Sequence, residues 1–371
     1  MITVTLTAPP DFDSLGAEWR RVEAMSDGSF FTSWSWTGCE AASRFPDPLL
    51  LRAETAGRTI ALALFNRTRS PFGDTLWLGE SGDPALDTVF IEHNAPLITR
   101  DAPPETATLL FEAMRRGGFA RRVVLSGIGD ALAGRALPLR GTIRRQHDRP
   151  APYAGFTVLR DAGQDYDSGL SFNTRYQLRR SLRRYAERGP VTITPAADAA
   201  EAVEFLDAMG RLHQATWEGR GAPGAFANPF FRRFHAELLA RAVPRGEAEM
   251  LRIAAGDEVL GYLYNFLWQG WSLSYQSGFA YPGDDNHRKP GLTCHHLAIQ
   301  RHFAAGGAGY DFLAGAARYK TSLANGQRTL YWLETGPIWR RGAIADKIQV
   351  LRQRWSNTRK NDDRSSGVNE D

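Results

Sequence analysis

The segment 249–315 constrains the fold of this chain more than any other stretch of its sequence. Apolar residues recur at strand period in three consecutive runs, 250–254, 259–268 and 271–279. Gly256 and Gly270 lie between these runs, where tight turns need a residue that tolerates positive φ. The pattern therefore predicts a three-stranded antiparallel meander.

A helix and a short strand are predicted to follow the meander. Pro290 suits the first turn of a helix, Gly306-Gly307 end it, and 310–313 form a strand. The apolar stripe of this helix consists of Leu292, His296, Ile299 and Phe303. The predicted order is meander, helix, strand.

A similar order of elements occurs about 200 residues earlier in the chain. Residues 50–53 turn through Ala56-Gly57 into 59–65, and the helical stretch 104–116 ends at Gly117-Gly118 before a strand at 122–125. We interpret this as an internal duplication, with chance resemblance between two α+β segments as the alternative.

The chain is also too long for one core. Its 371 residues exceed the roughly 250–300 at which single cores stop growing, so two domains are expected. We predict an α+β fold with a mixed sheet, made of related domains at 1–150 and 151–340 and a linker near Arg149-Pro150-Ala151-Pro152. Beyond them, 344–355 reads as a basic amphipathic helix, and 356–371 is predicted to be disordered.

Charge and cysteine content limit the class of protein. Lys and Arg outnumber Asp and Glu by only 45 to 41, so any basic partner surface must be local. Cys39 and Cys294 are too few for a disulfide framework. The start of the chain lacks a signal-peptide pattern, and no apolar run approaches the roughly 18 residues of a membrane span. We expect a cytoplasmic protein, with peripheral contact to the inner membrane as the alternative.

The start of the helix after Lys289 has the chemistry that an acyl-CoA needs. Free N–H groups at a helix start suit a diphosphate, Arg288 and Lys289 add positive charge, and Gly291 permits close approach of the backbone. Pantetheine is an amide chain, which a strand edge at 274–278 can pair with. The candidate donor-binding residues are Ser274, Gln276, Ser277, Arg288, Lys289, Pro290, Gly291 and Leu292. An ordinary basic loop before an ordinary helix is the alternative.

Two other interpretations of this region fail on geometry. Gly306, Gly307 and Gly309 follow a helix and precede a strand, which is the reverse of the dinucleotide-binding order. His295 and His302 are separated by roughly 10 Å along a helix, which disfavours a zinc site, and we expect no metal. The matching helix of the first half begins after Asp101 and Glu105, whose charges repel a diphosphate. One active site per chain is therefore predicted.

A strongly basic helix is predicted at 175–188. Its six arginines, at 175, 179, 180, 183, 184 and 188, lie outside an apolar stripe of Leu178, Leu182 and Tyr185. This face suits an anionic glycan, a lipid-linked intermediate, a membrane surface or the donor's phosphates. Transfer RNA ranks below these partners, because no aromatic residues interleave with the arginines at base-stacking spacing. A solvated helix face is the alternative.

Three further residue groups are candidates for the acceptor site and the chemistry. Trp217 and Arg220 lie in a glycine-rich stretch suited to a sugar ring and its hydroxyls, and Tyr275 is added to them as a substrate-binding residue. Tyr319 is placed to protonate the leaving thiolate beside Lys320. Asp311, His213 and Glu218 are the alternatives for the base, of which Asp311 is assigned with Tyr319 and Lys320 as catalytic.

Taken together, these residues resemble the FemAB-like GNAT acyltransferases, specifically the CelD/BcsL-type proteins encoded with bacterial exopolysaccharide and cellulose biosynthesis. The matching pieces are 93–97, the arginine-rich helix, 217–226, 288–292, and 310–315 followed by Tyr319-Lys320. The resemblance implies a tandem GNAT fold, acetyl-CoA or another acyl-CoA as donor, and an amino sugar or similar saccharide precursor as acceptor. Polysaccharide synthesis proteins are then possible partners. Ala316-Ala317 depart from the family, which often carries an acidic residue there, so a carboxylate role at that turn is in doubt.

Two other functions remain open at this point. Aminoacyl transfer from tRNA to a peptidoglycan precursor would use the arginine helix for the tRNA. A degenerate GNAT protein would bind a ligand, or organise a polysaccharide synthesis complex, without catalysis.

Overall fold

The computed structural model describes residues 1–336 except 72, 117–119, 137–142, 282 and 284. The helix expected at 344–355, the tail at 356–371 and the helix stop at Gly117-Gly118 lie outside the described residues. The described strands form one 13-stranded sheet in the order β1-β2-β3-β4-β6-β13-β7-β12-β11-β10-β9-β8, with β5 (Leu97–Ile98) paired to β3.

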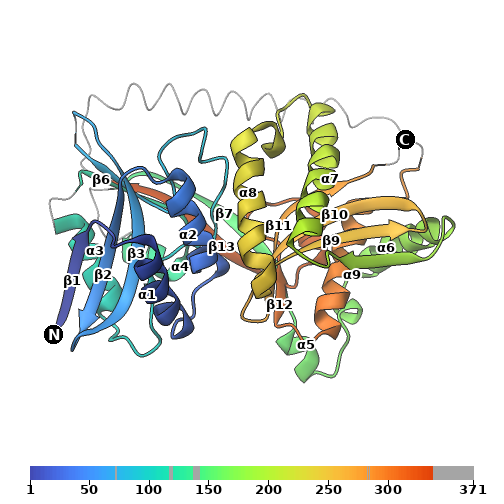
Figure 1. Cartoon of the computed structure of the whole chain (residues 1–371). Helices are drawn as coiled ribbons and strands as arrows, with labels where there is room; N and C mark the ends of the chain where they lie inside the picture. Colours follow the sequence, from blue (N-terminus) through green and yellow to red (C-terminus); the bar gives the residue numbers. More distant parts are fainter. Residues whose placement is uncertain (72, 117–119, 137–142, 282, 284, 337–371) are drawn as a thin grey trace.

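The same sequence of elements is found on both sides of the middle of the sheet (Figure 1). The N-terminal half comprises β1 (Ile2–Thr7), α1 (Phe12–Ala24), α2 (Trp34–Arg44), β2 (Pro48–Thr55), β3 (Arg58–Thr68), β4 (Thr75–Leu78), α3 (Thr106–Arg116), β6 (Arg122–Gly129) and α4 (Asp130–Ala136). The C-terminal half comprises β8 (Val191–Pro195), α7 (Ala199–Glu218), α8 (Pro229–Ala242), β9 (Ala248–Ala255), β10 (Glu258–Trp268), β11 (Trp271–Phe279), α9 (Pro290–Ala304), β12 (Gly309–Asp311) and α10 (Arg318–Leu323). The predicted meander and helix are confirmed as β9, β10, β11 and α9.

Individual residues also repeat between the halves, which confirms the internal duplication. Gly57 and Gly256 occupy the β2–β3 and β9–β10 turns with φ of 74° and 55°. Both turns need left-handed backbone, which glycine adopts without steric cost. Asn66 in β3 and Asn265 in β10 are both fully buried, and each follows its turn glycine by the same number of residues.

The last strand of each half completes the sheet of the other half. β7 (Ile143–Gly155) leaves the N-terminal half and pairs antiparallel with β12, whereas β13 (Gly326–Thr335) returns and pairs antiparallel with β6. β7 and β13 also pair with each other along their length. The two halves therefore share one continuous sheet.

This exchange corrects the expectation of a linker at Arg149-Pro150-Ala151-Pro152, because these residues lie inside β7. The carbonyls of Pro150 and Pro152 accept hydrogen bonds from Gly315 and Phe312. The proline nitrogens face the same side, beyond the end of the short strand β12, where a missing N–H donor removes no ladder bond. Prolines in polar surroundings were a misleading signal here.

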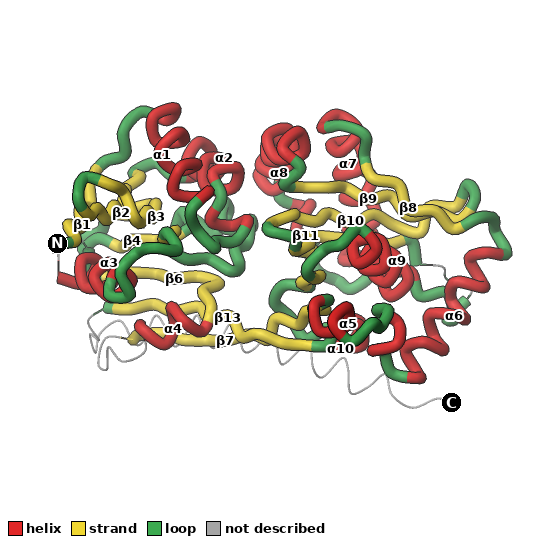
Figure 2. The backbone as a smooth tube through the Cα atoms, turned by 90° about the horizontal axis from the view of Figure 1, so that it is seen from below, coloured by secondary structure: helices red, strands yellow, loops and turns green. Residues whose placement is uncertain are grey.

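Helices cover both faces of each half of the sheet (Figure 2). In the N-terminal half, α1 and α2 bury Trp19 and Trp34 on one face, while α3 and α4 bury Leu110 and Leu132 on the other. In the C-terminal half, α7 and α8 cover one face, and α6 (Phe172–Ala186), α9 and α10 cover the opposite face. Alternating side chains of the strands feed the two cores, as strand geometry requires.

The halves also meet in a buried aromatic cluster. Trp36 of α2 lies 5.4 Å from the ring of Phe234 in α8 and 5.7 Å from that of Phe266 in β10. All three side chains are fully buried. Removing such a ring typically costs ~3–5 kcal/mol of folding free energy, so the packing fixes the halves against each other.

Candidate active site

The C-terminal half has a free strand edge that the N-terminal half lacks. β11 pairs in parallel with β12 only through Trp271, Ser272 and Leu273, because β12 ends at Asp311. The following residues of β11, up to Phe279, pair with β10 alone in the described part of the chain. In contrast, all four residues of β4 are paired with β6. Of these two equivalent strands, β11 is therefore the one that offers unpaired backbone to a ligand.

Backbone atoms of Ser277 face this free edge. Its N–H donates to Oε1 of the Gln276 side chain at 3.1 Å, and its carbonyl lies 3.1 Å from Nδ1 of His213. Neither atom is therefore used in the ladder to β10. A strand edge held by two side chains is exchangeable, since an extended amide chain can take over the same bonds.

Gly278 lies on the same strand and permits the close packing of α7 on the sheet. A Cβ on Gly278 would lie 2.3 Å from the carbonyl oxygen of Met209 in α7. The glycine is therefore required by the close approach of α7 to the sheet. That approach brings His213, one turn further along α7, over Ser277.

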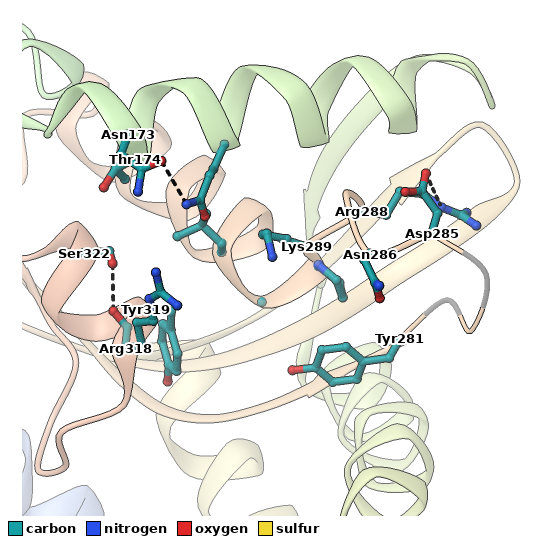
Figure 3. Close-up of a pocket in the computed structure, with 14 residues that line it drawn as sticks. Asn173, Thr174, Tyr281, Asp285, Asn286, Arg288, Lys289, Arg318, Tyr319 and Ser322 are labelled. Atoms are coloured by element: carbon teal, nitrogen blue, oxygen red, sulfur yellow. Dashed lines mark hydrogen bonds and ion pairs between the residues drawn. The ribbon is translucent and has the colours of Figure 1, made fainter. Parts of the chain in front are cut away.

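A pocket of 390 Å³ opens at the start of α9 (Figure 3). No side chain caps the helix start at Lys289, so the N–H groups of Gly291 and Leu292 lack an intrahelical acceptor. The exposed cations Lys289 and Arg318 reach toward this space from α9 and α10, and neither makes an ion pair with a described residue. The pocket thus combines a helix dipole with two available cations, which is the chemistry of a phosphate site.

The remaining predicted residues of this helix start are mostly structural. Arg288 lines the pocket but is only 8% exposed, and its Nη1 is 3.0 Å from the Glu258 carboxylate. Pro290 and Leu292 are buried. Gly291 lies in the pocket wall, where a Cβ would meet the Phe279 ring at 3.3 Å. Charge toward a ligand therefore comes from Lys289 and Arg318 rather than from Arg288.

A second pocket of 770 Å³ lies between the end of α7, the free edge of β11 and the start of α10. Its lining includes Trp217 and Arg220, whose guanidinium carbon is 5.7 Å from the centre of the Trp217 ring. His213 is also in its wall, and its Nε2 is buried with no hydrogen-bond partner among the described residues. The aromatic and guanidinium groups predicted for the acceptor are thus brought beside a ring nitrogen.

The state of His213 suits it to accept a proton. Burial lowers the pKa of His213 below its usual range, so the ring is neutral near pH 7. Because the Ser277 carbonyl can only accept, Nδ1 carries the hydrogen and Nε2 keeps its lone pair. Of the three candidate bases, His213 alone lines this pocket: Glu218 is exposed at the end of α7, and Asp311 lies elsewhere.

A third, smaller pocket of 150 Å³ continues from the second toward the interface of the halves. Ser274, Gln276 and Ser277 line it from β11, and Glu92 lines it from the N-terminal half. The Glu92 carboxylate accepts a hydrogen bond of 2.5 Å from the N–H of Ala314, and burial raises the pKa of Glu92. A carboxylate thus stands beside the turn where Ala316-Ala317 lack one.

Tyr319 lines all three pockets. Its ring stacks on His295 at a centroid distance of 4.8 Å and an interplanar angle of 11°. Burial raises the pKa of Tyr319, so the phenol stays protonated and can donate its hydrogen at neutral pH. The structure therefore places the predicted acid where the three spaces meet.

Lys320 lines the 150 Å³ pocket, and its ammonium is bonded to the backbone. Its Nζ donates to the carbonyls of Phe312, Leu313 and Ala314 at 2.7, 3.3 and 2.8 Å. Leu313 has a φ of 59°, so the turn that wraps this ammonium is itself in left-handed backbone. An ammonium has three hydrogens, and all are used here. Lys320 therefore holds the turn before Tyr319, and its catalytic role stays a prediction.

Asp311 lies in a separate pocket between the halves. Its buried carboxylate accepts a hydrogen bond from the N–H of Leu313 at 2.7 Å and lies 3.1 Å from Nε2 of His93 and 3.3 Å from Arg328. That pocket, of 460 Å³, shares no lining residue with the three that meet at Tyr319. The carboxylate therefore lies apart from Tyr319 and is bonded to three groups, and its catalytic role stays a prediction.

Tyr275 belongs to the core. Its side chain is 4% exposed, its hydroxyl donates to the carbonyl of Phe90 at 3.3 Å, and its ring stacks on that of Phe90. The register with β10 shifts at Tyr264 and Asn265, so β11 carries a bulge at Tyr275. This bulge turns the ring into the core beside the 150 Å³ pocket, and the contact of Tyr275 with the acceptor stays a prediction.

Sequence reasoning missed Glu92, because no local pattern around this residue indicates that it reaches a pocket of the other half. Cys294 is buried, and burial raises the pKa of its thiol, so it is no nucleophile.

Among the residues that the structure describes, no group of His, Cys, Asp and Glu side chains is arranged to hold a metal ion. No helix of the described chain is long and apolar enough to cross a membrane.

Part of the chain is similar to a known family. Residues 173–321, which run from α6 into α10, match the family described as "Acetyltransferase (GNAT) domain". GNAT domains generally use acyl-CoA as the donor. No curated protein matches the chain in sequence. The predicted GNAT-like α+β fold in two related halves is confirmed, and the C-terminal half is the one that carries the recognised domain.

Solved structures share the fold over both halves. FemX matches with a TM-score of 0.57 and 9% identity, covering 89% of this chain and 96% of that chain. The C-terminal domain of a protein described as a putative lysylphosphatidylglycerol synthetase from Agrobacterium fabrum matches with a TM-score of 0.55 and 11% identity, covering 92% of this chain and 97% of that chain. L-PGS from Bacillus licheniformis matches with a TM-score of 0.52 and 11% identity, covering 94% of this chain and 97% of that chain. At these identities the similarity establishes the fold but does not identify the substrates, which have to be inferred from the site.

Proposed function

We propose that the protein transfers an acyl group, in the simplest case acetyl, from acyl-CoA to an amine or hydroxyl of a saccharide precursor in exopolysaccharide or cell-envelope synthesis. The observation that carries this proposal is the meeting of three pockets at Tyr319. One pocket has a cationic helix start, the second a neutral histidine with a free lone pair, and the third the free strand edge.

The donor occupies the first and third pockets in this proposal. Its diphosphate binds the N–H groups of Gly291 and Leu292, with Lys289 and Arg318 as counter-charges. The pantetheine arm then pairs with the edge at Ser277, where it replaces the Gln276 side chain and shares the carbonyl with His213, since a carbonyl accepts two hydrogen bonds. The arm is thereby directed toward Tyr319.

The reaction needs a base for the acceptor and an acid for the leaving group. The acceptor nitrogen or oxygen attacks the thioester carbon, and Nε2 of His213 takes the acceptor's proton. The carbon–sulfur bond breaks, and the Tyr319 hydroxyl gives its proton to the thiolate before solvent restores it. Both groups line the 770 Å³ pocket, and each has its pKa shifted toward the protonation state that its role needs.

The acceptor occupies the 770 Å³ pocket from the side of Trp217 and Arg220. A ring face stacked against an indole, with a guanidinium to bind hydroxyls, is a common way to recognise a sugar. The size of the pocket is sufficient for a sugar unit, whose polar groups would find His213 and Arg220 within the same wall. The N-terminal half contributes Glu92 to the neighbouring pocket, and its described strands offer no second donor edge at β4.

Thiol release from acetyl-CoA, measured across a panel of amino sugars, tests the function. Lys289→Glu is expected to raise the KM for acetyl-CoA by about 10–100-fold, because a charge-assisted contact to phosphate is replaced by repulsion. Arg211→Glu is the matched control, since Arg211 is exposed on α7 and lines none of the pockets described above. Equal KM values for the two variants contradict the phosphate site.

Aminoacyl transfer from tRNA is the second candidate, favoured by the exposed arginines of α6 and by the shared fold with FemX and L-PGS. It predicts that aminoacyl-tRNA supplies the acyl group and that free coenzyme A does not bind. A protein that binds a ligand without turnover predicts coenzyme A binding without thiol release for any acceptor. Calorimetry with coenzyme A, followed by the thiol assay, separates the three.

A further inference from the structure

The outward side of α6 combines exposed aromatic and basic side chains. Successive residues of an α-helix are about 100° apart, so Phe172, Tyr176, Arg179, Arg180 and Arg183 all lie within one side of the helix. We call these five residues the α6 outer face. The opposite side holds the buried residues Thr174, Leu178, Ser181 and Tyr185, which pack toward α9 and the sheet.

Both aromatic residues of this face are exposed in the described structure. Phe172 is 73% exposed and Tyr176 is 48% exposed, although large apolar side chains are usually covered. They are one helical turn apart and therefore form a single exposed patch. Figure 2 shows α6 at the outer edge of the C-terminal half, away from the N-terminal half. The patch is thus accessible to a large, flat partner.

The charges of the outer face are uncompensated. Arg179, Arg180 and Arg183 make no ion pair with any residue that the structure describes. Other arginines of the helix are committed: Arg175 donates to the carbonyl of Leu170 at 2.7 Å, and Arg184 pairs with Glu187. The committed arginines lie to the sides of the outer face, so the available positive charge is concentrated around Phe172 and Tyr176.

We propose that the α6 outer face docks the protein on an anionic lipid bilayer. Guanidinium groups bind the phosphates of the lipid headgroups, and the two aromatic side chains enter the boundary between headgroups and acyl chains. A nucleic acid would use the arginines but would leave Phe172 and Tyr176 without a role on a convex helix. The core of a protein interface is usually depleted of charge. A bilayer alone satisfies both kinds of side chain.

Sedimentation with lipid vesicles tests this proposal independently of acyl transfer. The wild-type protein is expected to bind vesicles of phosphatidylcholine with about 30% phosphatidylglycerol far more strongly than vesicles of phosphatidylcholine alone, a composition chosen for the charge density of anionic membranes. Arg179→Gln combined with Arg183→Gln should lower the partition coefficient roughly 25-fold, since each basic residue near the surface contributes roughly fivefold. Arg211→Gln combined with Arg233→Gln removes the same charge from the exposed surfaces of α7 and α8 and should leave binding within about twofold.

The aromatic residues distinguish a bilayer from other anionic partners. Phe172→Ser combined with Tyr176→Ser should weaken vesicle binding by roughly tenfold or more, because apolar area no longer enters the lipid. An unchanged melting temperature shows that these exposed changes leave the fold intact. Equal binding to neutral and anionic vesicles, or binding to tRNA that the double serine variant leaves unchanged while vesicles do not bind, overturns the proposal.

The position of the contact can be measured directly, because both native cysteines are buried. Phe172→Cys and Arg211→Cys are each labelled with an environment-sensitive fluorophore. We expect a blue shift on addition of anionic vesicles for the label at 172 and no shift for the label at 211. A shift at 211 alone places the membrane contact elsewhere and refutes the assignment to α6.

Discussion

Replacing His213 by asparagine is the sharpest test of the proposed chemistry. The amide introduced by His213→Asn can still donate to the carbonyl of Ser277, as Nδ1 does at 3.1 Å in the native chain, but it has nothing in the place of Nε2. The change therefore removes the base and keeps the contact that holds α7 over β11. A positioned general base contributes about 10²–10⁴-fold to a rate, or ~3–5 kcal/mol of activation free energy. We expect kcat/KM for acetyl transfer to fall by that factor.

The pH dependence of the same variant carries a second signature. Burial lowers the pKa of His213, so the native enzyme should keep a constant kcat/KM as pH falls to about 6.5, the ordinary histidine value, and lose activity only below it. The His213→Asn variant should lack this acidic limb. An amine acceptor titrates as well and adds a further limb to the pH profile of kcat/KM of both proteins. This limb should be missing when the acceptor is a hydroxyl.

Calorimetry and thiol release together decide the outcome. The dissociation constant for coenzyme A should stay within about threefold in the variant, because the strand edge is intact. Glu218→Gln, at the exposed end of the same helix, is the matched control and should retain full activity. A kcat/KM of His213→Asn close to the native value, or an acidic limb that persists in the variant, refutes the assignment of the base. Loss of activity in Glu92→Gln with no loss in His213→Asn transfers the role to Glu92.

Three further predictions concern the framework of the site. Gly278→Ala should lower the free energy of unfolding by about 1–3 kcal/mol in urea titrations, since the new Cβ meets the Met209 carbonyl. Gly134→Ala in α4 is the control and should not destabilise the protein, because the space around Gly134 is open. Lys320→Met should lower the same free energy by ~2 kcal/mol as three carbonyls lose a charged donor; loss of activity at unchanged stability would instead restore a chemical role for Lys320. His235 is fully buried, and burial strongly lowers its pKa, so at acidic pH the unfolded chain is protonated at this histidine while the folded chain is not. The stability that is present above about pH 6.5 is therefore lost as pH falls, by ~1.4 kcal/mol per pH unit at most. His235→Phe should flatten that slope between about pH 6.5 and 5, and an unchanged slope contradicts the assignment.

Local structure in the C-terminal half could be predicted from the sequence because neighbouring signals agree there. Turn glycines, strand-period apolar runs and Pro290 each specify the same boundaries, and β9, β10, β11 and α9 follow them. The predicted strand at 310–313 is shorter in the structure, because Asp311 turns its carboxylate onto the N–H of Leu313. That single side-chain bond ends β12 and opens the edge of β11.

The candidate site was harder to predict, since its residues depend on long-range contacts. Lys320 has the chemical character of a catalytic residue, and only the structure shows the three carbonyls that its ammonium holds. Glu92 reaches its pocket across the interface of the halves, which no pattern in one sequence encodes. Tyr319 and Lys289 both line a pocket, because each belongs to a local feature, a helix start beside the strand ends; their predicted roles stay predictions.

The exchange of β7 and β13 affects how the protein folds while it is being synthesised on the ribosome. Contacts between β6 and β13 join residues such as Arg122 and Glu334, 212 positions apart. The N-terminal half therefore emerges with an incomplete sheet edge at β6, and that edge is closed only after the end of β13 has been synthesised. Such distant pairings slow folding and leave an open strand exposed to other chains in the meantime. The molecule should thus gain its stability late and in one step, with neither half maturing ahead of the other.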